Sequence, residues 1–188
     1  MTQILIDQFQ DDIYVFADGR CTAGDYIVQD NFNKIDVKKS NSYEIVTVLA
    51  GHPSIRDYLV LKYMENRGSQ FVRWAFEQRD HEDTLHEIEG LIIDKDLDNC
   101  TIEMFIFSKS DKREIGVMKT YMTDIPIFFG SGTLPLRTAY NTLKIGEKKN
   151  NPKLTFKKYL GHIQDCFDES AAIVNSCGPL NNYYKVTT

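Results

Sequence analysis

Short apolar runs, some alternating with polar residues and some unbroken, predict β-strands over the first fifty residues. The first two runs, at 3–9 and 13–17, flank the polar turn Gln10-Asp11-Asp12 and therefore predict a β-hairpin. The second of them is apolar almost throughout, which is typical of a strand buried on both faces. Further strands are expected as a pair within 26–38, broken at 30–31, and at 43–50, with a loop at 22–25.

After position 52 the apolar residues recur with helical spacing. Pro53 suits the first turn of a helix, where its missing N–H has no intrahelical partner to lose, and Gly68 marks the end of that helix. A second helix is predicted over 70–77. Residues 81–89 are acidic and leave two alternatives, a continuation of that helix or a surface loop.

The second half of the chain repeats the order of strands followed by helices. Strands are predicted at 91–93, 101–107, 115–122, 125–129 and 183–186, helices at 133–143 and 155–174, and an exposed linker loop at 148–152. Because antiparallel hairpins dominate, the predicted fold class is α+β, in a single domain over residues 1–188.

Composition indicates a globular protein, with 42% hydrophobic and 26% charged residues in a chain of 188. A net charge of −5 argues against nucleic acid or an anionic membrane as a partner. No apolar run approaches the roughly 18–20 residues that a membrane span needs, and no secretory signal is expected. The four cysteines form no CxxC pair, so we expect reduced thiols, a cytoplasmic location and neither a metal nor a cofactor.

Thr2 is a candidate nucleophile if Met1 is removed. A threonine hydroxyl holds its proton too tightly to attack a carbonyl at neutral pH, but an α-amine on the same residue titrates at about pH 7.7–8.0 and can accept that proton. Asp18 and Lys34 follow Thr2 by 16 and 32 residues. Taken singly, Thr2 is an ordinary second residue and Lys34 a solvated charge at a strand edge.

With these spacings the sequence resembles the proteasome-type N-terminal nucleophile (Ntn) hydrolases, and among them the HslV-like bacterial peptidases, in a divergent bacterial or phage form. Val-Phe-Ala-Asp-Gly-Arg at 15–20 and Asp-Asn-Phe-Asn-Lys-Ile at 30–35 match the family context of the aspartate and the lysine. Gly-Ser-Gly at 130–132 precedes a helix, as in the family. Leu-Ala-Gly at 49–51 resembles the loop that forms the oxyanion hole.

The resemblance implies a four-layer αββα sandwich and a threonine-type endopeptidase that works through an acyl-enzyme. Thr2 would be the nucleophile. Lys34, held by Asp18, would lower the pKa of the Thr2 amine or hydroxyl. Gly51 would donate its N–H to the oxyanion, and Ser131 would assist proton transfer. The family implies polypeptide substrates and a homo-oligomeric ring. Because the chain has no ATP-binding loop, degradation of folded proteins would need a separate AAA+ unfoldase.

Two other functions stay open. The aspartate that the family carries after its last helix has no counterpart at 174–179, where Asn175 or Ser176 is the alternative, and Met1 precedes Thr2. Both observations suit a proteasome-fold assembly or interaction protein that has lost catalysis. A small-molecule amidase without a ring is the third interpretation. Without the resemblance, residues 130–132 are only a connection from a strand to a helix, in which Ser131 or Thr133 caps the helix that follows.

Overall fold

The computed structural model describes residues 2–23, 26–78, 88–108, 116–120 and 126–187. The chain divides into two compact units, one formed by Met1–Ile35 with Asp124–Thr188 and the other by Asp36–Thr123. Each unit combines helices with an antiparallel sheet, so the α+β class is confirmed. The single domain over 1–188 stays a prediction.

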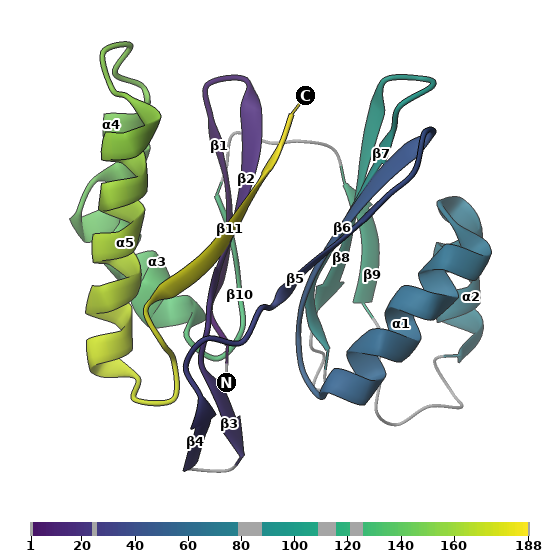
Figure 1. The fold of residues 1–188 in the computed structure, drawn as a ribbon, viewed down its shortest axis with the longest axis horizontal. Helices are drawn as coiled ribbons and strands as arrows, with labels where there is room; N and C mark the ends of the chain where they lie inside the picture. The colour runs from purple at the N-terminus through teal and green to yellow at the C-terminus, as the bar shows by residue number, and fades with distance from the viewer. Residues whose placement is uncertain (1, 24–25, 79–87, 109–115, 121–125, 188) are drawn as a thin grey trace. The chain divides into compact units, whose positions relative to one another are not determined.

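The first unit is built on a four-stranded antiparallel sheet in the order β10-β1-β2-β11 (Figure 1). Its strands are β1 (Ile4–Phe9), β2 (Asp12–Asp18), β10 (Ile127–Phe129) and β11 (Leu180–Val186). The predicted hairpin is confirmed, because Ile4 pairs with Ala17 and Phe9 with Asp12. Every β2 side chain except Asp12 is buried, as its apolar run predicts.

Three helices cover one face of this sheet: α3 (Thr133–Thr142), α4 (Ile145–Lys149) and α5 (Phe156–Ile173). Alternate strand residues such as Leu5 and Phe16 enter the core that these helices share. Asp7 is buried in the same core, where its carboxylate accepts from Tyr140 (2.6 Å), Tyr159 (2.7 Å) and Lys149 (2.7 Å).

The predicted linker at 148–152 is wrong in its first part, because Lys148 and Lys149 belong to α4. Lys149 looks like a solvated residue in the sequence, but its ammonium reaches the buried Asp7 carboxylate and its side chain is only 11% exposed. The last helix and the last strand are confirmed, and β11 begins three residues earlier than predicted.

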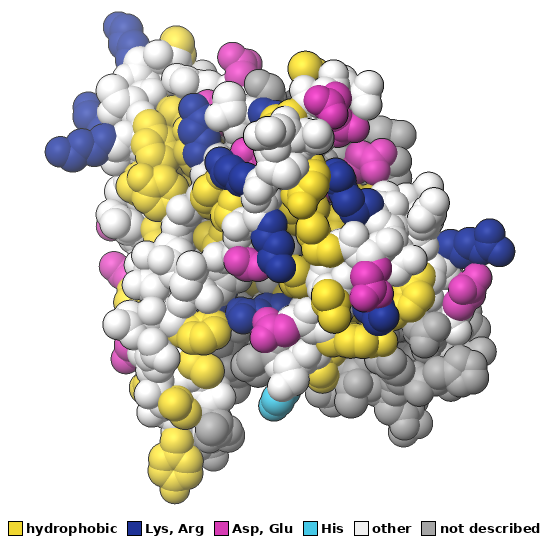
Figure 2. All heavy atoms as spheres, turned by 45° about the vertical axis from the view of Figure 1, so that its right-hand side comes forward, with side chains coloured by type: hydrophobic (Ala, Val, Ile, Leu, Met, Phe, Trp, Pro, Cys, Tyr) yellow, Lys and Arg dark blue, Asp and Glu magenta, His cyan; other side chains and the backbone are white. Residues whose placement is uncertain are grey.

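A separate two-stranded hairpin joins β3 (Cys21–Ala23) to β4 (Tyr26–Gln29). Two strands do lie within the stretch predicted at 26–38, but they do not pair with each other: β4 pairs with β3, whereas β5 (Ile35–Lys39) pairs with β6 (Tyr43–Ala50). Of the loop predicted at 22–25, Thr22 and Ala23 belong to β3, and residues 24–25 lie outside the described residues. Hydrophobic side chains project at the tip of this hairpin (Figure 2), and Tyr26 is 81% exposed.

The second unit has a sheet in the order β5-β6-β7-β8-β9, with β7 (Glu89–Asp96), β8 (Thr101–Ser108) and β9 (Gly116–Thr120). Helices α1 (Pro53–Asn66) and α2 (Ser69–Gln78) share a core with this sheet, in which Tyr63 and Phe71 pack on Phe105. His52 caps α1 by accepting from the Ser54 N–H at 3.3 Å. Of the acidic stretch predicted at 81–89, residues 81–87 lie outside the described residues, and β7 begins at Glu89.

None of the helices within the described ranges combines the length and the apolar character that crossing a membrane requires.

Candidate active site

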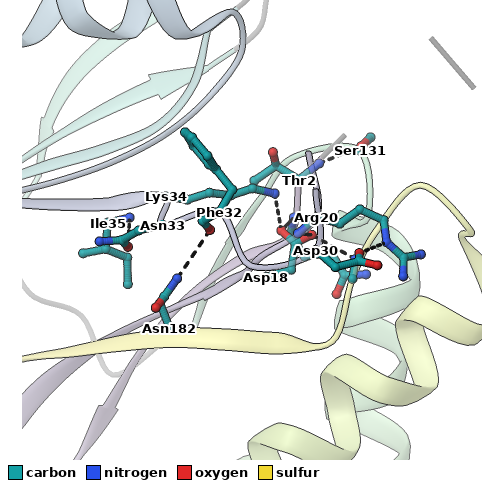
Figure 3. Close-up of polar contacts among 12 residues, drawn as sticks. Thr2, Asp18, Arg20, Asp30, Phe32, Asn33, Lys34, Ile35, Ser131 and Asn182 are labelled. Carbon is teal, nitrogen blue, oxygen red and sulfur yellow. Dashed lines mark hydrogen bonds and ion pairs between the residues drawn. The ribbon is translucent and has the colours of Figure 1, made fainter. Parts of the chain in front are cut away.

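Thr2 lies just before β1 and is held by the turn that connects β10 to α3. Its backbone N–H donates to Ser131 Oγ at 3.3 Å (Figure 3), and the Gly132 N–H donates to the Thr2 carbonyl at 3.4 Å. Gly130 has φ +91°, and a Cβ at that position would collide with the Thr2 carbonyl oxygen. The first glycine of this turn therefore allows the close approach that brings the Ser131 hydroxyl to the Thr2 nitrogen.

The default prediction that Ser131 or Thr133 caps α3 is wrong. The N-cap residue is Gly132, and no side chain makes a cap hydrogen bond there. The Thr133 hydroxyl donates instead to the Gly130 carbonyl at 2.5 Å. The Ser131 hydroxyl is thus available to Thr2.

Asp18 and Lys34 form a buried ion pair, with Nζ to Oδ1 at 2.7 Å and side-chain exposures of 0% and 6%. The Asp18 carboxylate also accepts from the backbone N–H groups of Gln3 (2.8 Å), Gly178 (2.9 Å) and Arg20 (3.3 Å). One carboxylate thereby links the residue after Thr2 to Lys34 and to the segment after α5. Figure 3 shows the Lys34 ammonium pointing to Asp18 beside Thr2.

Burial lowers the pKa of the Lys34 ammonium, and the Asp18 carboxylate opposes that shift. The lysine is consequently a buried group whose charged form the Asp18 carboxylate stabilises. A charge in such surroundings acts more strongly on neighbouring groups than it would in water.

Arg20 fixes the two loops that carry the partners of Asp18. Its Nε donates to Asp30 at 2.5 Å and its Nη1 donates to the Asn175 carbonyl at 2.6 Å. The Phe32 N–H donates to the Gly19 carbonyl at 2.9 Å. These bonds hold the segment just before Lys34 and the segment after α5, whereas the sequence on its own suggests only a surface ion pair for Arg20.

The loop after α5 presents Cys177 and Gly178 to the site, although the sequence points to Asn175 or Ser176. The Gly178 N–H donates to Asp18, and the Asn175 carbonyl accepts from Arg20. Cys177 is fully buried, and burial raises the pKa of its thiol. Sequence reasoning missed Cys177 and Gln3 because neither residue belongs to a recognisable motif.

The first unit thus brings together four of the five predicted site residues, Thr2, Asp18, Lys34 and Ser131. Gly51 belongs to the second unit, where it directly follows β6 and has φ +136°. Its oxyanion role stays a prediction, as do the catalytic roles of the other four. Among the described residues, no group of three or more His, Cys, Asp or Glu side chains is arranged to hold a metal ion.

No protein-family model and no curated protein sequence matches this chain. Solved structures do match along almost its whole length. Eukaryotic HslV from Trypanosoma brucei superimposes with a TM-score of 0.62 at 16% identity, covering 98% of this chain and 97% of HslV. The chain has an HslV-like, proteasome-type Ntn hydrolase fold.

Two further structures agree with this assignment. BPH from Thiobacillus denitrificans, in complex with epoxomicin, matches with a TM-score of 0.62 at 11% identity, covering 98% of both chains. Anbu (ancestral β-subunit) from Yersinia bercovieri also gives 0.62, at 10% identity, covering 98% of this chain and 87% of Anbu. Identities this low establish the fold and leave the chemistry to the residues of this chain.

Proposed function

We propose that this chain is an N-terminal threonine peptidase whose nucleophile, Thr2, is exposed when Met1 is removed. The observation that carries the proposal is the buried ion pair of Asp18 and Lys34 beside Thr2. Asp18 Oδ1 accepts both from Lys34 and from the N–H of Gln3, the residue next to Thr2. Burying two charges is unfavourable unless hydrogen bonds or a function offset the cost. Here both charges lie beside Thr2.

In the proposed mechanism, the Thr2 Oγ attacks the peptide carbonyl carbon while its proton passes to the Thr2 α-amine. The protonated amine then gives the proton to the leaving nitrogen, the C–N bond breaks, and an ester on Thr2 remains. Water, deprotonated by the same amine, hydrolyses that ester. The Lys34 ammonium favours the neutral amine and the developing alkoxide, and Ser131 accepts from the Thr2 nitrogen.

The proposed assembly is a homo-oligomeric ring that admits polypeptides. The apolar tip of the β3–β4 hairpin supports it, because exposed apolar side chains mark interaction surfaces. We also propose, from the resemblance, a four-layer αββα arrangement in which the Gly51 N–H would donate to the oxyanion. Folded substrates would need a separate AAA+ unfoldase.

The alternative is a proteasome-fold assembly or interaction protein without catalysis. The segment after α5 favours it, because Asp18 meets the backbone N–H of Gly178 there and no acidic side chain occupies 174–177. Such a protein would keep the ion pair for structure alone.

Intact mass of the full chain, before and after treatment with epoxomicin, separates the two functions. An epoxyketone carries two electrophilic carbons, so one molecule can bond both the Oγ and the α-amine of an N-terminal threonine. We expect a mass without Met1 and one probe adduct, lost in Thr2→Ala and kept in Thr2→Ser, which retains a hydroxyl. Hydrolysis of a fluorogenic peptide should follow the same pattern. Retention of Met1 with no adduct would refute the peptidase and favour the assembly protein.

A further inference from the structure

A second polar cluster, formed by Gln3 and Cys177, is buried against the Thr2 site. Both residues are 0% exposed. Neither the oxygen nor the nitrogen of the Gln3 amide has a hydrogen-bond partner among the described residues. A buried amide that lacks partners is unfavourable, so its place beside a buried thiol calls for an explanation.

The turn that holds Thr2 is packed on this cluster. A Cβ at Gly132 would collide with Gln3 Cγ and lie 2.8 Å from Cys177 Sγ, so only glycine fits between them. Burial raises the pKa of the Cys177 thiol, and the Gln3 amide and the Ser131 hydroxyl only partly oppose that shift. Cys177 is therefore a neutral thiol that lies, with Gln3, against the glycine next to Ser131.

We propose that Cys177, with Gln3 behind it, is a positioning residue that orients the Ser131 hydroxyl toward Thr2. The sulfur accepts the hydroxyl hydrogen of Ser131, so the Ser131 oxygen presents its lone pairs to the Thr2 nitrogen, 3.3 Å away. The proposal rests on the peptidase function, in which that nitrogen is the α-amine.

The orientation of Ser131 matters because the α-amine must keep its own lone pair to act as a base. A serine oxygen that accepts from the amine stabilises the ammonium form and raises the pKa of the amine. A serine hydroxyl turned the other way would donate to that lone pair, lower the pKa and block the base. Loss of Cys177 would release Ser131 into this second orientation.

The charged and titratable groups around Thr2 come from three elements. Asp18 ends β2, Lys34 precedes β5 and Cys177 follows α5. The Arg20 guanidinium donates instead to Asp30 and to the Asn175 carbonyl. Asp18 and Lys34 neutralise each other, so substitution of the uncharged Cys177 changes no net charge near the amine. A shift in the pKa of the amine would then report on hydrogen bonding.

The test measures the pKa of the Thr2 α-amine directly. The full chain beginning at Thr2 is released from a fusion, and trace acylation by acetic anhydride is followed against pH by mass spectrometry of the N-terminal peptide. The variants are Cys177→Ala, Cys177→Ser and the matched control Cys166→Ala. Cys166 is equally buried, but its sulfur contacts the Leu136 carbonyl at 3.4 Å.

We expect Cys177→Ala to lower the pKa of the amine by about half a unit to one unit, a 3- to 10-fold loss of proton affinity. Cys177→Ser should restore it, and Cys166→Ala should leave it unchanged. In a Ser131→Ala background, Cys177→Ala should have no further effect, because the group that it orients is gone. An unchanged pKa in Cys177→Ala, or an equal shift in Cys166→Ala, would overturn the proposal.

The same preparations separate this proposal from the peptidase function. A chain that neither reacts with epoxomicin nor cleaves peptides, yet shows the Cys177-dependent shift, would refute the function and keep the positioning role. A chain that cleaves peptides through Thr2 with no such shift would refute only the positioning role.

Discussion

Substituting Asp18 by Asn tests whether the buried ion pair is a structural and electrostatic unit. The change keeps the shape of the side chain but removes its charge. It removes the carboxylate charge that pairs with the buried Lys34 ammonium, and it turns an NH₂ group toward the N–H groups of Gly178 and Arg20. We expect the free energy of unfolding to fall by about 3–5 kcal/mol, the range for breaking a buried pair from one side.

Lys34→Met should be milder, because the Asp18 carboxylate keeps three backbone N–H donors. Loss of one hydrogen bond to a charged group is worth about 1.5–3 kcal/mol. The double variant should lose about 1–3 kcal/mol less than the sum of the single losses, because it removes both charges together. Asp18→Asn should therefore destabilise more than Lys34→Met, because Asp18 keeps other hydrogen bonds when Lys34 is replaced.

Urea unfolding followed by tryptophan fluorescence and circular dichroism measures these differences. Lys185→Met is the matched control: its ion pair with Asp12 is as short, at 2.6 Å, but Lys185 is 46% exposed. That variant should lose at most about 1 kcal/mol. Additive effects of Asp18→Asn and Lys34→Met, or a Lys185→Met loss as large as that of Lys34→Met, would refute the reasoning.

The pH dependence gives an independent check. Burial holds the pKa of folded Lys34 below its unfolded value of about 10.4. Between the two values the unfolded chain binds a proton that the folded chain does not, so this residue makes the free energy of unfolding rise with pH. The stability of the wild type relative to Lys34→Met should therefore grow as the pH rises toward about 10.4. A difference that shrinks would contradict the assigned direction.

Further substitutions test the turn that holds Thr2 and the buried hydrogen bonds of Asp7. Gly130→Ala should lower the free energy of unfolding by at least about 2 kcal/mol and abolish the epoxomicin adduct, because Gly130 has φ +91° and a Cβ there would collide with the Thr2 carbonyl. The control is Gly161→Ala, in open space on α5, which should raise the free energy of unfolding by about 0.5–1 kcal/mol. Tyr159→Phe should lose about 1.5–3 kcal/mol in urea unfolding by removing one donor from Asp7, and an unchanged midpoint would show that the carboxylate does not depend on it.

Elements with a clear period could be predicted from the sequence, and elements fixed by distant partners could not. The first hairpin and α5 follow from alternation and from helical spacing, which are local properties. The short helix α4 is joined to the sheet by distant partners, such as Asp7, which lies 142 residues from Lys149. The hairpin of β3 and β4 was hidden because β3 has only three residues.

The residues of the candidate site likewise divide into those that a sequence pattern identifies and those that only the fold brings together. Asp18 and Lys34 could be found because their spacing from Thr2 resembles a family pattern. Gln3 and Cys177 carry no pattern, and their significance lies in burial and in contacts that only the fold creates. Local sequence rules extend over a few residues, whereas the bond from Thr2 to Ser131 spans 129 positions.

The order of synthesis places a constraint on when this site exists. The unit Asp36–Thr123 is continuous and is complete on the ribosome before α5 has been made. The unit that holds Thr2 is closed by segments on both sides of it, and the bond from Gly178 to Asp18 joins residues 160 positions apart. A nascent chain therefore carries Thr2 without the residues that surround it until translation has passed residue 178. For a peptidase this is a built-in delay, which keeps an exposed threonine inert while unfolded polypeptide, its own included, is closest at hand.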